Sequence, residues 1–308
     1  MYASWDDAIV VYDIARIIEE DLRNKKQITG KYTLAIGDAE LTISPVYCDY
    51  LLSGVSSVKD VFLTTAETQR VHRGGNIGFS FIETDRHQLH FKLVGKGADG
   101  TLAVAEAEDE LSNWMNDFEF LSSVEDVIGY ILEHDKNHSG LVPGTEVSVT
   151  LAAGNSYKTW FIVKDAEFLR FVYRNIFNAQ EFVDVVCEVT DKTTINRDDS
   201  ICNGSVIQYN QNTERVYEVV TAALTPTEAK LIDQLVNSRE ISVFVGDTPQ
   251  AVIITASTLE MSNADDQLPV AKFTWRFRDQ RPRLLPDDTP AFRKSSNIFT
   301  EQFTREFS

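Results

Sequence analysis

Apolar and polar residues alternate with a period of two along most of this chain, which is the pattern of β-strands that bury one face. In the last such run, residues 270–277, Phe273 and Trp275 share one face while Lys272 and Arg276 take the other. Turn signals rich in Gly, Asp, Asn and Pro separate the runs at short intervals, so the predicted class is antiparallel β. The runs that predict strands are 32–44, 78–93, 145–151, 159–163, 182–189, 215–220, 241–255 and 270–277.

Two segments have the apolar spacing of a helix instead. Residues 122–134 carry one apolar stripe and open with a capping box formed by Ser122 and Glu125. Residues 225–236 open with a similar signal. Near the N-terminus, residues 8–22 fit either a third helix or a kinked strand. The opening signal of residues 225–236 consists of Thr225 at the N-cap, Pro226 at the first helical position and Glu228, which completes the capping box.

The strongest boundary signal is the polar stretch HDKNHSGLVPG at residues 134–144. A chain of 308 residues is long enough for two ordinary domains, and we place the division near Gly140. We therefore predict a mainly β protein with two β-sandwich or barrel-like halves, two or three short helices and an extended C-terminal arm. The predicted units are an N-terminal β-rich domain (1–140), a C-terminal β-sandwich domain (141–284) and a C-terminal assembly arm (285–308).

The charge balance narrows the choice of partners. The formal net charge is −18, so the average surface repels phosphate backbones and anionic lipid heads. Residues 271–308 carry +3 and the rest of the chain −21, which makes the C-terminal end complementary to the body. We expect no nucleic acid and no membrane among the partners.

Cysteine usage and the N-terminal sequence indicate the compartment. The cysteines are odd in number, with no C-x-x-C pair, which argues against a disulfide framework or a zinc knuckle. The N-terminal sequence MYASWDDAIVVYD has acids where a signal peptide needs basic residues, and no stretch approaches about 18 apolar residues. We expect a protein made in the cytoplasm with free thiols. The three cysteines are Cys48, Cys187 and Cys202.

One local pattern raises the possibility of a calcium site. The stretch DKNHSGLVPGTE, from Asp135 to Glu146, has the residue types of an EF-hand loop at five of its positions. The alternative is a helix end with Gly140 near the C-cap, followed by a Pro-Gly turn. The strand-like sequence that follows Glu146 favours this alternative. The five matching residues are Asp135, Asn137, Ser139, Gly140 and Glu146.

The remaining motifs point to no reaction. The glycine-rich stretch HRGGNIG, residues 72–78, does not match a Walker A sequence and is better explained as a loop. The chain contains no G-x-S-x-G sequence. We therefore expect a protein that is not an enzyme and needs no cofactor. A hydrolase acting on cell-wall polymer would instead require a cleft with paired carboxylates of perturbed pKa.

The segment FLRFVYRNIFNAQEF, residues 168–182, is dense in aromatic and arginine side chains. Such residues are enriched at the centres of protein interfaces, which predicts a contact surface. An equally good interpretation is a buried strand followed by a turn at residues 175–180. The interface candidates in this segment are Arg170, Tyr173, Arg174 and Phe177.

The C-terminal segment FRKSSNIFTEQFTREFS repeats phenylalanine every four residues, at Phe299, Phe303 and Phe307. A helix over 298–307 would place the three rings on one stripe, yet it is shorter than the roughly 12–15 residues that a stable isolated helix needs. It must dock to persist, either on its own body or on a neighbouring subunit, where each buried ring contributes about 1.5–3 kcal/mol. We interpret this arm as an assembly device.

Four motifs follow one another over about residues 145–285: the aromatic turn YRNIFNAQEF, the helix LTPTEAKLIDQLVNS, a short hairpin with the Ile-Thr end AVIIT and the closing strand FTWRFR. In this layout the second half of the sequence resembles structural proteins from the tail and baseplate gene clusters of tailed bacteriophages and prophages. The resemblance implies a β-rich virion component of the tail, baseplate or connector region. It transfers no catalytic position.

The function expected from these features is that of a non-enzymatic virion structural protein. Its partners would be copies of itself, in a homo-oligomer, and other virion structural proteins, and its final location would be the virion. The alternative is a carbohydrate or cell-surface binding module, with or without calcium in the loop from Asp135 to Glu146. A calcium-dependent shift in melting temperature would favour that alternative.

The assembly role of the arm predicts the effect of removing it. A chain truncated after Leu285 is expected to fall from a defined oligomer to a monomer, because the three phenylalanines are lost. The solution mass of both chains, measured across a range of concentration and salt, checks this. An unchanged oligomer with unchanged melting would contradict the assembly role.

Overall fold

The computed structural model is mainly β with three helices, as the sequence predicts. The predicted arm with Phe299, Phe303 and Phe307 lies outside the described residues. These residues are 2–5, 8–11, 14–48, 61–64, 66–82, 88–110, 115–116, 119–154, 156–164, 166–202, 205–260 and 268–279. None of the helices in these ranges is long and apolar enough to span a membrane.

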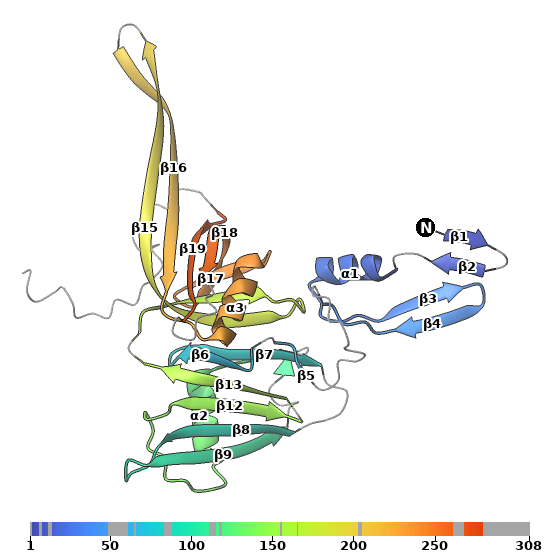
Figure 1. The fold of residues 1–308 in the computed structure, drawn as a ribbon, viewed down its shortest axis with the longest axis vertical. Coiled ribbons are helices and arrows are strands. Elements are labelled where there is room, and N and C mark those ends of the chain that lie inside the picture. Colours follow the sequence, from blue (N-terminus) through green and yellow to red (C-terminus); the bar gives the residue numbers. More distant parts are fainter. Residues whose placement is uncertain are drawn as a thin grey trace, which may run out of the picture.

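The first half of the fold is built from two sheets that share one core (Figure 1). Helix α2 (Val124–Glu133) packs its apolar stripe into the same core. The four-stranded sheet has the order β10-β11-β7-β5, with β10 (Met115–Asn116), β11 (Glu119–Ser123), β7 (Asn76–Ile82) and β5 (Val61–Phe62). The five-stranded sheet has the order β6-β13-β12-β8-β9, with β6 (Thr68–His72), β13 (Ser156–Val163), β12 (Ser148–Ala153), β8 (Gln88–Lys96) and β9 (Leu102–Glu110).

The strand pairing places the boundary between the two halves later in the sequence than the predicted position near Gly140. Strands β12 and β13 follow Gly140 in the sequence, yet they pair with β8 and β6 of the first half. The division predicted near Gly140 therefore falls inside the first core, because the loop at 134–144 joins α2 to strands of the same sheet. The chain passes from the first core to the second at residues 164–167, between β13 and β14.

The second half is a closed six-stranded barrel with helix α3 (Pro226–Asn237) packed against its core. Aromatic rings fill its interior. The Trp275 ring stacks on Tyr217 with centroids 4.3 Å apart and meets Phe171 edge-on at 6.3 Å. The barrel order is β14 (Phe168–Arg174), β15 (Gln180–Cys202), β16 (Ser205–Thr221), β19 (Val270–Phe277), β18 (Thr248–Glu260) and β17 (Ile241–Val245).

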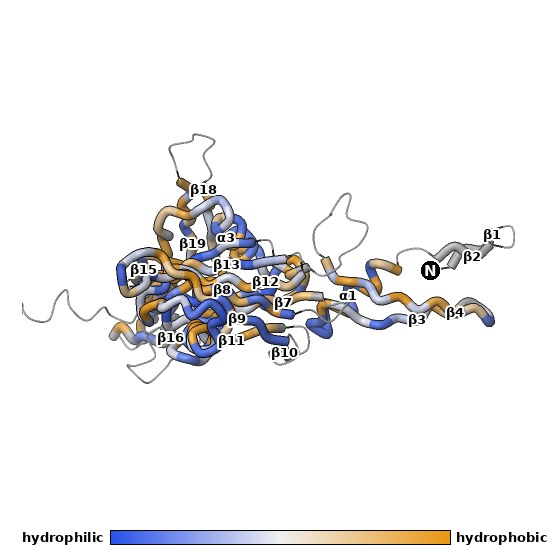
Figure 2. Tube along the Cα trace, turned by 90° about the horizontal axis from the view of Figure 1, so that it is seen from below, coloured by the Kyte–Doolittle hydropathy of each residue, from blue (hydrophilic) through white to orange (hydrophobic). Residues whose placement is uncertain are grey.

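The N-terminal residues form a separate extension beside the two halves. Helix α1 (Ile14–Lys25) packs against the hairpin of β3 (Tyr32–Ile36) and β4 (Ala39–Ile43), and Ile18 and Leu22 are its buried residues. Figures 1 and 2 show α1, β3 and β4 reaching away from the packed body. A further strand pair, β1 (Tyr2–Trp5) and β2 (Ala8–Val11), precedes α1.

Strands β15 and β16 continue far beyond the barrel as a two-stranded ribbon, which rises above the other barrel strands in Figure 1. Strand β14 pairs with β15 only as far as Val186, and β19 pairs with β16 only from Tyr217 to Val220. The ribbon pairing continues to Cys202 and Ser205, with a β-bulge at Asp198 and Asp199. We call residues 190–202 and 205–216 the projecting hairpin.

Local capping signals explain two of the helices. The full capping box at Thr225 and Glu228 forms as predicted. For α2 the N-cap is Ser123 and not Ser122: the Ser123 hydroxyl accepts the backbone N–H of Asp126 at 3.0 Å, so the predicted box of Ser122 and Glu125 does not open the helix. The ambiguous segment 8–22 contains both a strand, β2, and the first part of α1.

Candidate functional site

The segment 168–182 forms strand β14, a tight turn and the start of β15. The Asn175 side chain builds the turn, because its Oδ1 accepts hydrogen bonds from the backbone N–H groups of Phe177 (2.9 Å) and Ala179 (3.2 Å). Asn178 adopts the left-handed φ of 59°, which asparagine tolerates better than most residues. The buried strand and turn that were one of the two interpretations are therefore present.

A buried ion pair joins this segment to the first half. The Lys158 ammonium in β13 lies 2.9 Å from Glu181 Oε1 in β15, and their side chains are 0% and 3% exposed. Thr64 donates its hydroxyl proton to the same carboxylate oxygen, and Asn175 Nδ2 donates to the other oxygen at 3.0 Å. Asn175 Nδ2 also donates to the Leu63 carbonyl at 2.7 Å. We call this group the junction cluster.

Aromatic rings enclose the junction cluster. The Lys158 ammonium lies 5.4 Å from the centre of the Trp160 ring, a cation–π contact. Tyr173 is buried in the barrel, and burial together with the negative charge of Glu181 raises the pKa of its hydroxyl well above the usual range. The side chains of Lys158 and Glu181 are therefore almost completely shielded from solvent.

A second ion pair lies within the barrel at the same junction and binds the backbone of the first half at His72 and Gly74. Arg170 Nε donates to Asp184 Oδ1 at 2.8 Å, and Asp184 Oδ2 accepts the backbone N–H of His72 at 2.8 Å. A Cβ on Gly75 would lie 2.7 Å from both Arg170 Nη2 and Asp184 Oδ2. The glycines of HRGGNIG thus let the β6–β7 loop approach this ion pair closely.

A third pair connects β6 to helix α3. Arg70 binds both carboxylate oxygens of Glu228, with Nη2 to Oε2 at 3.0 Å. Glu228 also accepts the Thr225 backbone N–H in the capping box of α3. The carboxylate that begins the helix therefore also anchors it to the first half.

On the other side of the turn, the same segment holds the N-terminal extension. Asn178 Nδ2 donates to the carbonyls of Leu22 (3.3 Å) and Gln27 (3.1 Å) at the C-terminal end of α1. Arg174 Nη1 donates to the carbonyls of Asn178 (2.6 Å) and Lys26 (3.3 Å). These donors fix the backbone where α1 ends, at Leu22, Lys26 and Gln27, to the β14–β15 turn.

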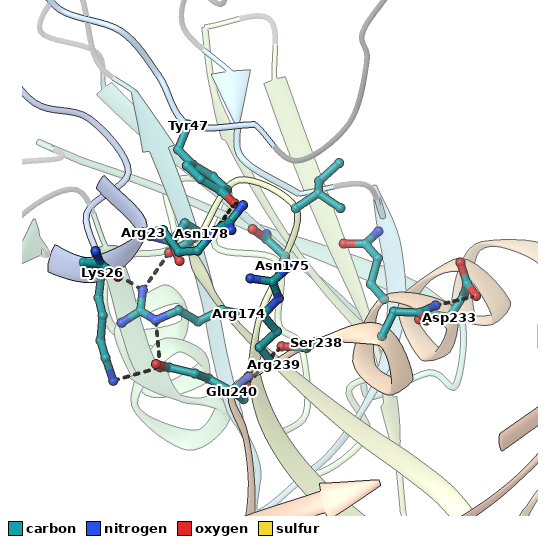
Figure 3. Close-up of a pocket in the computed structure, with 14 residues that line it drawn as sticks. Arg23, Lys26, Tyr47, Arg174, Asn175, Asn178, Asp233, Ser238, Arg239 and Glu240 are labelled. Carbon is teal, nitrogen blue, oxygen red and sulfur yellow. Dashed lines mark hydrogen bonds and ion pairs between the residues drawn. The ribbon is translucent and has the colours of Figure 1, made fainter. Parts of the chain in front are cut away.

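Glu240 links the extension to the barrel. Its carboxylate lies 2.9 Å from the Lys26 ammonium and 3.4 Å from Arg174 Nε (Figure 3). Partial burial acts to raise the pKa of Glu240, but the hydrogen bonds and charges of Lys26 and Arg174 outweigh it and lower that pKa.

A cleft of about 490 Å³ opens between α1, the β14–β15 turn and the end of α3 (Figure 3). Four cations and two carboxylates line it, so its walls carry a net charge of +2 in a chain of −18. We call it the cationic cleft. The charged residues in its walls are Arg23, Lys26, Arg174, Arg239, Asp233 and Glu240.

The four interface candidates of this segment all have contacts within their own chain. Arg170 and Arg174 are ion-paired, Tyr173 is buried in the barrel, and Phe177 packs against the small cluster of Ile28, Leu63 and Ala179. The segment is a contact surface between three parts of one molecule. Its contact with another subunit stays a prediction.

The loop from Asp135 to Glu146 is shaped by hydrogen bonds. Asp135 Oδ1 accepts from the backbone N–H groups of Glu106 and Asn137, and Oδ2 accepts the N–H and hydroxyl of Ser139. Glu146 is buried and accepts the Gly144 N–H at 2.7 Å. In the ranges that the structure describes, no three acidic, His or Cys side chains converge as a metal site would require.

The projecting hairpin is the feature that sequence reasoning missed. Residues 190–201 are all exposed, and their sequence lacks the alternation of apolar and polar residues that identified the other strands. The Asn203-Gly204 dipeptide was the available signal, since it favours two-residue hairpin turns. Three apolar side chains on one face of the ribbon are exposed: Ile195 (48%), Ile201 (79%) and Val206 (67%).

Replacing Lys158 tests the weight of the junction cluster. Lys158→Met is expected to lower the free energy of unfolding by about 3–5 kcal/mol, because it leaves the Glu181 carboxylate buried without its cation. The double variant Lys158→Met, Glu181→Gln should recover most of this loss. Denaturant titration measures both values.

The matched control is Lys192→Met, which breaks the exposed pair of Lys192 and Glu218 and is expected to cost at most about 1 kcal/mol. Equal losses for Lys158→Met and Lys192→Met would show that the buried pair does not hold the halves together.

No model of a known protein family matches this chain, and no curated protein sequence matches it. The function must therefore be argued from the geometry of the junction, the cleft and the projecting hairpin.

Proposed function

We propose that this protein is a non-enzymatic structural subunit that assembles with its neighbours through the projecting hairpin. The observation that carries the proposal is a two-stranded ribbon, about 12 residues long in each strand, with no third strand beside it in the described part of the chain. At about 3.3 Å per residue it reaches roughly 40 Å beyond the barrel.

The ribbon is poorly suited to standing alone. An isolated two-stranded hairpin is marginally stable in water, and its outer edges present backbone N–H and C=O groups that can pair with another chain. It also exposes Ile195, Ile201 and Val206 on one face. A neighbour that adds a strand or covers this face would satisfy both requirements.

The base of the hairpin is stiffened, which suits a part that must meet a partner in a fixed orientation. Lys192 pairs with Glu218 at 2.6 Å and Arg276 with Glu214 at 2.8 Å. Arg215 pairs across the ribbon with Asp191. These exposed pairs add little stability individually, but they restrict the ribbon close to the barrel.

The buried polar groups of the junction also favour a structural role. The Lys158 side chain is completely enclosed, and both oxygens of Glu181 are hydrogen-bonded to the chain itself. These groups connect two cores and offer a substrate no access.

The resemblance noted in the second half supplies the context of the proposal. It implies a component of the tail, baseplate or connector region of a tailed phage, made in the host cytoplasm and incorporated into the virion. The partners would be copies of itself and other virion structural proteins. The arm with Phe299, Phe303 and Phe307 would be a second assembly contact.

Shortening the hairpin tests the proposal. Deleting residues 194–202 and 205–214 retains Asn203 and Gly204 and brings the paired residues Thr193 and Arg215 next to the turn. This variant is expected to stay monomeric at concentrations where the full chain forms oligomers. Its melting temperature should change by no more than a few degrees, because the deleted residues bury little surface.

A second variant separates loss of the apolar tip from loss of length. Replacing Ile195, Ile201 and Val206 with Ser should weaken assembly, whereas the matched control with Leu102, Leu121 and Ile253 replaced by Ser should not. These control residues are 70%, 52% and 40% exposed elsewhere on the body. Light scattering that gives the same mass for the full and shortened chains would refute the proposed function.

A further inference from the structure

We infer that the cationic cleft of one copy receives the tip of the projecting hairpin from a second copy of the chain, with Arg239 of the cleft facing Asp199 of the tip. The inference rests on the proposed assembly function and names its partner and its receiving surface.

The cleft has the charge that an acidic tip requires. Its four cations outnumber its two carboxylates, while the chain as a whole carries −18. Glu240 is already shared by Lys26 and Arg174. Arg239 is exposed, and it has no hydrogen-bond or ion-pair partner among the described residues. A guanidinium in this position is available to a carboxylate from outside.

The tip supplies such a carboxylate, because Asp198 and Asp199 outnumber Arg197 among residues 195–202 and 205–213, whose net charge is −1. Asp198 and Asp199 are adjacent at the β-bulge, four rungs or fewer from the end of the ribbon. The bulge lies on the opposite strand, where β16 has one extra residue, Tyr209, between the partners of Asp198 and Asp199, and it bends the ribbon at this point. Asp199 is exposed, and no partner of its side chain lies within the described part of the chain. Beyond it, the exposed Ile201 and Val206 can cover apolar parts of the cleft such as Ile176.

The two surfaces cannot meet within one molecule. Strand β15 begins directly after the turn that lines the cleft and ends at the tip of the hairpin, and it contains 23 residues. Its contour length is therefore on the order of 75 Å, and Figure 1 shows the tip far from α1. The contact must join different copies.

A contact between two different surfaces is heterologous. Each copy then offers one tip and one cleft, so copies join head to tail and form a ring if the rotation closes or a helical stack if it does not. Both arrangements suit a repeating structural subunit, and both present every copy with the same pair of contacts.

Charge reversal with mixing tests the pairing. Arg239→Glu and Asp199→Arg place like charges in the contact, so each variant alone should assemble about tenfold more weakly than the wild-type chain. An equal mixture of the two variants should regain wild-type assembly, because each contact between unlike chains again pairs opposite charges. Analytical ultracentrifugation of the three samples at one ionic strength measures this.

The control variants Lys272→Glu and Asp247→Arg change the charge by the same amounts at exposed positions outside the cleft and tip, and they should assemble like wild type. Single variants that assemble normally, or a mixture that stays as weak as its components, would overturn the inference. If the shortened hairpin still abolishes assembly in that case, the proposed function stands and only the receiving surface is wrong.

Discussion

The ion pair between Lys158 and Glu181 is the interaction on which the arrangement of the molecule depends. It is almost completely buried, and it connects β13 of the sandwich to β15 of the barrel. Either charge left alone in this place would cost several kcal/mol, so the cores pack stably only in an arrangement that pairs the two charges. The hydrogen bonds from Thr64 and Asn175 leave little freedom in how the cores meet.

This constraint gives the projecting hairpin a direction. Glu181 and Asp184 lie at the start of β15, and both are held by groups of the junction. The same strand then passes through the barrel wall and leaves it as one half of the ribbon. A partner that grips the tip therefore acts on a strand that is fixed at its opposite end. The cationic cleft lies at that fixed end, which relates the two proposed contact surfaces through one strand.

Some of this architecture follows from local sequence rules. Strand β19 coincides with the run 270–277. Its apolar and polar residues alternate because one face of the strand lies in the barrel core and the other lies outside. Helix α3 begins at Pro226 because Thr225 and Glu228 satisfy its first backbone donors. Such signals depend only on neighbours in the sequence, and they are sufficient to predict a mainly β protein with capped helices.

The rest depends on residues far apart in the chain. Lys158 lies on the same face of β13 as the buried Trp160, but the local sequence does not show how a lysine is accommodated there, because its partner Glu181 comes 23 residues later. The boundary between the two halves lies after β13 because β13 pairs with β6 of the first half. No local sequence pattern predicts this pairing. The ribbon is polar on both faces near the barrel, so it lacks the apolar period that identifies a strand. The aromatic and arginine-rich sequence around Arg174 identified it as a contact residue. The cleft that it lines forms where α1 and α3 lie close together, and the local sequence does not show this.

Hydrogen exchange in the projecting hairpin, compared between dilute subunits and assembled protein, is the most direct test of the account. In an antiparallel ribbon, alternate amides point away from the partner strand. These outward amides of residues 190–202 and 205–216 are expected to exchange rapidly in the dilute subunit and to become protected on assembly. Rapid exchange that persists in a fully assembled sample would contradict the central role of the hairpin.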